Sequence, residues 1–159
     1  MYFEEIKGDL VKQTKSNIIA QCISSDCGMG AGVVVPICKM IPPLKQSCKD
    51  YAALSSKINT NIIGTAYRFS YENHICYNMF TKKNYWDNAE RNMTYDEYMS
   101  NLKSCLNDVK RQMLSNNEEK IAMPRIASGL DKCKWEDVRA LIKDVFEDTD
   151  IKVYIYYLD

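Results

Sequence analysis

Two adjacent lysines, Lys82 and Lys83, follow Phe80 and Thr81 at the end of an apolar stretch. A lysine in such a place could pair with a phosphate or, once it has lost its proton, attack an electrophilic carbon. Two neighbouring lysines are more often solvated surface charges. The residue types alone therefore leave phosphate binding and nucleophilic attack open, and they favour a solvated pair.

A turn with three alternating glycines, Gly28, Gly30 and Gly32, lies between a predicted strand and a predicted helix. Glycines let the backbone approach a ligand closely, and free amides at a helix start attract phosphate or sugar oxygens. The spacing differs from the dinucleotide-binding fingerprint because the third glycine comes too early. A ligand-binding loop and a plain tight turn are equally consistent with this spacing.

The turn from Pro124 to Asp131 also joins a predicted strand to a predicted helix. Ser128 and Gly129 could offer amides to a diphosphate, and Asp131 could act as a base or hold a ribose hydroxyl. Alternatively, Asp131 lies near a helix start simply because the helix dipole favours a carboxylate there. Without further context the second interpretation is favoured.

The elements that must position these turns follow from hydrophobic patterning. Predicted strands are Met1–Ile6, Asn17–Ile23, Thr65–Tyr71, His74–Thr81, Lys120–Met123 and Ile151–Leu158, with a turn at Gly8–Leu10 and a hairpin joining the third and fourth strands. Predicted helices are Gly30–Met40, a short one after Pro42 and Pro43, one starting at Thr94, and one from Trp135 to Phe146. This alternation predicts an α/β fold, a three-layer sandwich around a mixed sheet, with ligands beyond the strand ends.

The helix that starts at Thr94 has the clearest signal. Thr94 and Glu97 have the spacing of a capping box, in which the threonine accepts from the backbone three residues on and the glutamate returns the bond. Apolar residues then recur every three or four positions: Tyr95, Tyr98, Met99, Leu102, Leu106, Val109 and Met113. We interpret this stripe, its tyrosines included, as core packing.

Composition limits the class of protein. The chain has 159 residues, with 21 Lys plus Arg against 21 Asp plus Glu. The length predicts one domain, residues 1–159, which we expect to be a monomer. The zero net charge argues against general nucleic-acid binding. The longest apolar stretches, such as Ile18–Ile23, are too short to cross a membrane.

Seven cysteines and one histidine bear on metal sites and on location. The cysteines form no C-x-x-C pair, so neither zinc nor another metal is expected. An odd number of scattered cysteines without a signal peptide fits a reducing compartment, in which thiols stay free. We therefore expect a cytoplasmic protein, or one of the host cytosol if the chain is viral.

Taken in order, the segments resemble the macrodomain family, specifically its terminal ADP-ribose protein glycohydrolase branch, also described as ADP-ribose 1″-phosphate processing. The resemblance covers nearly the whole chain. The segments that carry it are Lys7–Leu10, Cys22–Ser24, Asp26–Gly32, Thr81–Lys83, Met123–Ile126, Gly129–Asp131, Trp135–Glu136 and Val145–Ile151. The resemblance implies a three-layer α/β/α macrodomain sandwich.

The resemblance also implies roles. Asp9 would accept a hydrogen bond from the adenine amino group, and Tyr156 would pack against adenine. The lysine that matches Lys82 attacks the anomeric carbon of the distal ribose, and the aspartate that matches Asp131 helps to release the adduct. The loop Gly28–Val33 would wrap the distal ribose, while amides of Ile126–Leu130 would hold the diphosphate. The implied ligand-binding residues are Asp9, Leu10, Cys22, Ser24, Gly28, Met29, Gly30, Ala31, Gly32, Val33, Pro124, Ile126, Ala127, Ser128, Gly129, Leu130 and Tyr156.

The chain departs from the family pattern in two places. Ala127 and Ser128 stand where glycine and a small residue are frequent, and we expect Ala127 to limit the backbone there to less strained dihedral angles. The segment from Asn84 to Asn92 is longer and more aromatic than usual, and Tyr85 or Trp86 could form part of a substrate wall.

Three functions remain compatible with the sequence. The first is an ADP-ribosyl hydrolase that needs no metal or cofactor and removes ADP-ribose from an ester on a protein acidic side chain, from acylated ADP-ribose or from a nucleobase. The second is a reader that binds ADP-ribose, free or attached to a macromolecule, without turnover. The third is a phosphatase acting on ADP-ribose 1″-phosphate. Retention of both Lys82 and Asp131 favours the hydrolase.

Overall fold

The computed structural model describes residues 1–158. Its elements follow in the order β1 (Tyr2–Lys7), α1 (Leu10–Gln13), β2 (Ile18–Ser24), α2 (Val34–Met40), α3 (Leu44–Lys57), β3 (Ala66–Tyr71), β4 (His74–Lys82), α4 (Tyr95–Ser115), β5 (Lys120–Pro124), α5 (Trp135–Phe146) and β6 (Lys152–Tyr157). Every predicted strand is present, with small shifts at the ends.

The strands form one mixed sheet of six strands in the order β1-β6-β5-β2-β4-β3. Neighbouring strands are parallel except β3 and β4, which pair antiparallel from Ala66 opposite Met79 to Tyr71 opposite His74. This hairpin and the α/β class with a mixed sheet are confirmed. Because β2, β4 and β5 are parallel, their carboxyl ends meet at one edge of the sheet, where the three turns with candidate chemistry begin.

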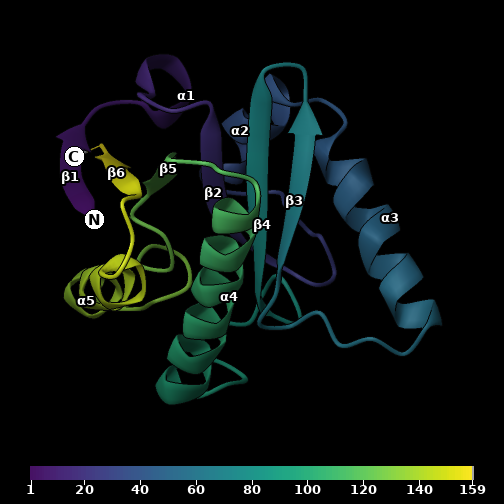
Figure 1. Cartoon of the computed structure of the whole chain (residues 1–159). Helices are drawn as coiled ribbons and strands as arrows, with labels where there is room; N and C mark the ends of the chain where they lie inside the picture. Colours follow the sequence, from purple (N-terminus) through teal and green to yellow (C-terminus); the bar gives the residue numbers. More distant parts are fainter. Residues whose placement is uncertain (159) are drawn as a thin grey trace.

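The helices cover both faces of the sheet (Figure 1). Helices α4 and α5 pack on one face, and the other face is covered by α1, α2 and α3. Strand β6 shows why both faces must be covered: Val153 and Ile155 belong to the core under α4 and α5, whereas Tyr154 and Tyr156 belong to the core on the other side.

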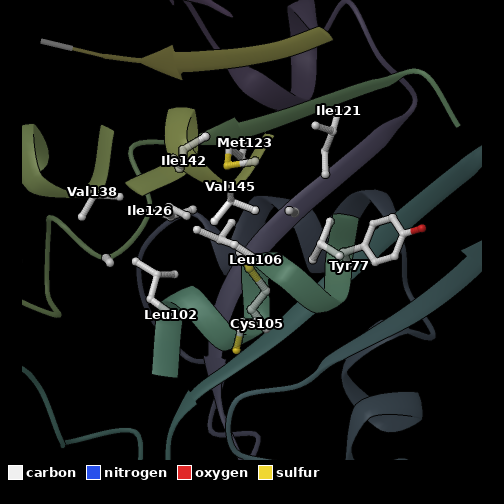
Figure 2. Close-up of a cluster of buried hydrophobic side chains, with 14 of the residues drawn as sticks. Tyr77, Leu102, Cys105, Leu106, Ile121, Met123, Ile126, Val138, Ile142 and Val145 are labelled. Carbon is white, nitrogen blue, oxygen red and sulfur yellow. The ribbon is translucent and has the colours of Figure 1, made fainter. Parts of the chain in front are cut away.

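Figure 2 shows buried apolar side chains of the core under α4 and α5. Leu102 and Leu106 of α4 and Ile142 of α5 are fully buried, and they belong to the same cluster as Ile121 and Met123 of β5. Full burial of side chains of this size contributes about 1.5–3 kcal/mol each. These contacts fix β5 and α4, from which part of the candidate site is built.

Helix α4 begins as predicted at Thr94, whose hydroxyl accepts from Glu97 N at 3.0 Å. Within residues 1–158 the exposed Glu97 side chain does not return the bond, so only half of the predicted capping box is formed. The predicted stripe faces the core, with Tyr98, Leu102 and Met113 fully buried.

Three predictions, two of helices and one of a turn, need correction. The helix expected over Gly30–Met40 begins only at Val34, which leaves Pro36 in its first turn, where a missing N–H is tolerated. The helix expected to be short after Pro43 runs for 14 residues. The turn expected at Gly8–Leu10 leads directly into the four-residue helix α1.

Two further features concern helices and thiols. Across residues 1–158, no helix is both long enough and apolar enough to span a membrane. All seven cysteines are free thiols, and five of them are buried.

Candidate functional site

A cavity of about 750 Å³ opens at the carboxyl ends of β2, β4 and β5. We call it the strand-end cavity. Its lining consists of Cys22–Ser24 with Gly28–Val34, Lys82 with Tyr85–Asn88, and Pro124–Ala127 with Gly129–Asp131. The volume lies in the range of small-molecule and cofactor sites. All three turns that the sequence singled out therefore border one cavity.

A second hollow of about 720 Å³ lies beside the edge strand β3. Its charged groups have structural partners: Asp108 pairs with Arg111 at 2.5 Å and accepts from Ala66 N at 2.8 Å. Gln112 donates to the Ala66 carbonyl at 2.8 Å. These side chains of α4 cap the exposed edge of the sheet, so the strand-end cavity is the candidate site.

Lys82 lies at the end of β4 and borders the cavity with only 9% of its surface exposed. Its Nζ donates to Asp131 Oδ1 at 2.6 Å, to the Tyr85 carbonyl at 3.0 Å and to the Asp87 carbonyl at 2.9 Å. The three donors of the ammonium group are all engaged. The adjacent Lys83, by contrast, is exposed.

Asp131 is held at both oxygens of its carboxylate. Oδ1 accepts from Lys82, and Oδ2 accepts from the hydroxyl of Tyr98, which also bonds the hydroxyl of Thr81 at 2.9 Å. The Asp131 backbone is fixed as well, since its carbonyl accepts from Ala89 N at 2.9 Å. The alternative interpretation, in which a helix dipole alone favours a carboxylate at Asp131, does not account for its hydrogen bonds to Lys82 and Tyr98.

Cys22 also borders the cavity, but it is not poised as a nucleophile. Burial raises the pKa of its thiol well above the ordinary value, and the negative charge of Asp131 acts in the same direction. The thiol therefore stays protonated at neutral pH, whereas cysteine attack requires a thiolate.

The glycine-rich loop is tied to the loop that follows β4 by Asp26. One carboxylate oxygen of Asp26 accepts from the Ser24 hydroxyl and from Gly28 N at 3.1 Å, and the other accepts from Tyr85 N at 3.0 Å. A Cβ on Gly28 would lie 2.7 Å from Tyr85 Cβ, so only glycine permits this approach. Tyr85 thus packs directly over the loop predicted to wrap a ribose.

The segment after β4 is built around Asp87. Its side chain accepts from Asn84 N and from Asn92 Nδ2, both at 3.0 Å. Burial alone would raise the pKa of Asp87, but hydrogen bonds from Asn92 and Asn84 lower it below the ordinary value. The carboxylate is thus ionised at neutral pH, and it braces the segment that presents Tyr85 and Trp86 to the cavity.

Tyr85 and Trp86 form an exposed aromatic pair at the cavity. Their side chains are 63% and 44% exposed, and the two rings meet edge to face with centroids 4.9 Å apart. Their backbone is nevertheless fixed to the site, because the Tyr85 carbonyl binds Lys82 and Tyr85 N binds Asp26.

The loop after β5 corrects the expectation for Ala127. Its backbone has φ +64°, in the left-handed region that alanine rarely adopts, rather than a less strained conformation. The surrounding contacts impose it: the Ala127 carbonyl accepts from Cys133 N at 2.9 Å, and its methyl group is buried in the core under α4 and α5. These contacts offset a cost of about 1–2 kcal/mol.

The same loop presents backbone donors. Within residues 1–158, the amides of Ala127, Ser128, Gly129 and Leu130 donate to no protein acceptor. Successive free amides in a turn that contains a left-handed residue form a concave donor surface for anions. A side chain at Gly129 would meet no atom within 4 Å.

Four of the predicted ligand-binding residues do not line the cavity. Asp9 caps α1, with Oδ1 accepting from Val11 N at 2.9 Å and Lys12 N at 3.2 Å. Leu10 and Tyr156 are buried in the core beside α1 and α2, and the Tyr156 hydroxyl accepts from a backbone amide at 2.8 Å. The Ser128 hydroxyl donates to a backbone carbonyl at 2.8 Å. Their assignment to ligand binding stays a prediction.

Five residues that line the cavity were not predicted to bind the ligand: Ile23, Val34, Asp87, Asn88 and Arg125. Tyr98 was assigned to the apolar stripe alone, yet its hydroxyl binds Asp131. The sequence contained one signal for this role, because a tyrosine in a buried helical stripe needs a hydrogen-bond partner for its hydroxyl.

Comparison with known proteins places these features in context. The Macro domain family model matches residues 21–142. The chain is 35% identical over 153 residues to the human (Homo sapiens) protein named ADP-ribose glycohydrolase OARD1, across 96% of this chain and 90% of that protein.

Solved structures show the same fold. The macrodomain of Mycobacterium tuberculosis DarG superposes with a TM-score of 0.82 at 18% identity, covering 99% of this chain and 98% of that one. Thermosipho africanus DarTG in complex with ADP-ribose gives a TM-score of 0.78 at 16% identity, covering 98% of this chain and 41% of that one.

Proposed function

Since the chain belongs to the Macro domain family, we propose that it binds ADP-ribose in the strand-end cavity and hydrolyses the ester that joins ADP-ribose to its carrier. The observation that carries this proposal is the buried pair of Lys82 and Asp131, 2.6 Å apart at the edge of the cavity. A protein that only binds ADP-ribose does not need a lysine in such a place.

Lys82 must lose a proton before it can attack, because a protonated ammonium group has no free electron pair. Each of its three N–H groups faces an acceptor that could take that proton or hold it in place. Two of its partners are backbone carbonyls, which do not take up protons. The third is the Asp131 carboxylate, within direct proton-transfer distance. Transfer from Nζ to Oδ1 leaves a neutral amine and a carboxylic acid, so Asp131 is the base in our proposal.

The amine then forms a C–N bond to the anomeric carbon of the distal ribose while the C–O bond to the carrier breaks. The electron pair of that bond leaves with the carrier as a carboxylate. Water next adds to the same carbon, the C–N bond breaks, and the departing Lys82 nitrogen keeps the proton that the water gives up. Asp131 releases its own proton to solvent, which restores the starting state.

Binding of the common ADP-ribose moiety is supported by the loops around the cavity. The free amides of Ala127–Leu130 suit the diphosphate, and the Gly28–Val33 loop lines the same cavity, where the distal ribose would meet Lys82. Adenine would lie toward Asp9, beyond the lining. We expect an affinity in the micromolar range or tighter, about −8 kcal/mol or more favourable.

The carrier would leave past Tyr85 and Trp86, which are exposed and yet tied to Lys82 through the backbone. This pair gives the attached group an aromatic wall. It contacts the carrier rather than ADP-ribose itself, and on this basis we expect it to influence which carriers are accepted.

Release of ADP-ribose tests the proposal directly. Wild type, Lys82→Ala and the control Lys83→Ala are incubated with protein carrying ADP-ribose on aspartate or glutamate, with ADP-ribosylated DNA and with ADP-ribose 1″-phosphate. Lys82→Ala should lose release by on the order of a thousandfold or more. Its affinity for ADP-ribose should stay within about tenfold of wild type, roughly 1.4 kcal/mol.

Lys83 is exposed, so Lys83→Ala should keep most of the wild-type activity. If wild type binds ADP-ribose and releases none from any carrier, the chain is a reader. If only the 1″-phosphate is hydrolysed, it is a phosphatase. Normal turnover by Lys82→Ala would exclude the lysine mechanism.

A further inference from the structure

Tyr98 is fully buried on α4, and its hydroxyl lies between Thr81 and Asp131. Neighbouring positions of the stripe, Leu102 and Leu106, are apolar. A phenol in such a position requires hydrogen bonds, since an unpaired buried hydroxyl is strongly unfavourable. Both partners of this hydroxyl are close to Lys82: Thr81 precedes Lys82 in the sequence, and the Asp131 carboxylate binds it.

The direction of each hydrogen bond in this chain of groups is determined. The Asp131 carboxylate can only accept, so the single proton of the Tyr98 hydroxyl points to Oδ2. The Thr81 hydroxyl must then donate to the Tyr98 oxygen at 2.9 Å. Lys82 donates to the remaining oxygen, Oδ1, at 2.6 Å.

We propose that Tyr98 is a positioning residue for the reaction: its hydroxyl occupies Oδ2 of Asp131 and thereby directs proton exchange with Lys82 to Oδ1. This inference rests on the proposed function. Tyr98 does not line the cavity, so it acts through Asp131 rather than on the substrate.

Two properties suit Tyr98 to this role. Burial raises the pKa of its phenol well above the ordinary value, and the neighbouring Cys22 and Asp131 act in the same direction. The hydroxyl therefore stays a donor throughout the neutral range. Its position is also fixed, because α4 is packed along the core and begins at the Thr94 cap.

Without the hydroxyl, Oδ2 would lose its donor and the carboxylate could turn about its Cβ–Cγ bond. Oδ1 would then spend less time aligned with Nζ of Lys82. The proton transfer from Lys82 to Asp131 that starts the reaction depends on this alignment, whereas ADP-ribose binding does not. A loss in kcat with unchanged affinity is therefore the expected signature.

Tyr98→Phe tests the inference, with Tyr77→Phe as the matched control. Tyr77 is another fully buried tyrosine whose hydroxyl donates to a carboxylate, that of Glu118, away from the cavity. Tyr98→Phe should lower kcat by on the order of tenfold or more, with KM and the Kd for ADP-ribose within about twofold. Tyr77→Phe should leave all three unchanged.

A double-mutant cycle separates positioning from a structural effect. If Tyr98 acts through Asp131, adding Tyr98→Phe to Asp131→Asn should not lower single-turnover release further, whereas independent effects would multiply. Should Tyr98→Phe not fold, Tyr98→Met takes its place, since it also lacks the hydroxyl.

Unchanged kcat in folded Tyr98→Phe, or multiplying effects in the cycle, would overturn the inference while wild-type turnover and its loss in Lys82→Ala left the proposed function intact. Absence of turnover in wild type would instead reject the proposed function, and the inference with it.

Discussion

The molecule contains two clusters built on one hydrogen-bonding pattern. In the Lys82 cluster, Asp131 binds Lys82 through one oxygen and the Tyr98 hydroxyl through the other. In the Arg68 cluster, formed by Arg68, Glu118 and Tyr77, the carboxylate binds the guanidinium at 2.6 Å and the Tyr77 hydroxyl through its second oxygen.

The clusters differ in the cation and in what lies beside it. Arg68 joins the β3–β4 hairpin to the segment between α4 and β5, and its guanidinium stays protonated under all ordinary conditions. Lys82 carries a primary amine that can become a nucleophile, and it borders the strand-end cavity together with Asp131. A cation, a carboxylate and a buried tyrosine joined by hydrogen bonds are thus not enough to identify an active site. The deprotonatable amine and the cavity make the difference.

Exchanging the two cations gives the largest expected effect. Lys82→Arg keeps a positive charge beside Asp131 but removes the nucleophile, so ester turnover should fall by on the order of a thousandfold or more. Arg68→Lys should keep kcat within about twofold and lose about 1.5 kcal/mol of unfolding free energy, the lower end of the range for one hydrogen bond to a charged group. Turnover and urea unfolding measure both.

The larger guanidinium of Lys82→Arg must fit where Nζ has three partners, so the folding of this variant has to be checked. Circular dichroism should show that it is folded. If folded Lys82→Arg retained turnover near the wild-type rate, the cation in this cluster would act only by its charge, and the distinction between the clusters would be lost.

The sequence predicted the fold better than it predicted this distinction. Strands and helices come from local patterns, so the β3–β4 hairpin and the stripe of α4 could be located within a few residues. Lys82 and Lys83 could not be told apart in the same way. Strand β4 is buried almost throughout, so no alternation separates an inward from an outward lysine at its end.

Contacts between distant positions were also beyond local patterns. Asp131 meets Lys82 across 49 residues of sequence, and Tyr98 meets Asp131 across 33. The prediction of an unstrained backbone at Ala127 was wrong for a similar reason. Its left-handed conformation is imposed by the hydrogen bond from Cys133 N and by burial, not by the preference of alanine. The family resemblance, rather than residue spacing, brought Lys82 and Asp131 together before the structure did.

Removing the charge of Glu118 gives an intermediate effect, on stability rather than on rate. The Glu118 side chain is 7% exposed and that of Arg68 is 27% exposed, so Glu118→Gln leaves a partly buried guanidinium without its counter-charge. Breaking a fully buried pair costs about 3–5 kcal/mol, and we expect about 2 kcal/mol here because glutamine can still accept from Arg68.

In the same variant kcat should stay within about twofold of wild type, since no step of the proposed reaction passes through the Arg68 cluster. Urea unfolding and turnover on one preparation measure both quantities. A fall in kcat comparable to that of Asp131→Asn would show that the two clusters are coupled and that the Arg68 cluster is not purely structural.

The smallest expected effect tests what the clusters share. Burial and the hydrogen bond to the carboxylate raise the pKa of Tyr77 above its ordinary value of 10.0, and burial and nearby negative charge do the same for Tyr98. A group whose folded pKa is raised gives stability that is complete below the unfolded pKa and is lost as pH rises above it. Between pH 9 and pH 10.5, each phenol should therefore cost the folded state about 0.8 kcal/mol of stability.

Tyr77→Phe and Tyr98→Phe each lack this loss, so the stability advantage of wild type over either variant should shrink by that amount in urea unfolding at the two pH values. The contribution of the cysteines cancels in the difference: Tyr98 interacts with Cys22, but burial raises the pKa of that thiol so far above the ordinary value that it stays protonated in the folded state with or without the phenol. Equal shrinkage in both variants, with a lower kcat only in Tyr98→Phe, would mean that the two hydroxyls stabilise the fold in the same way and that only one of them serves the reaction. A constant difference for either variant would show that its phenol is not the buried donor described above.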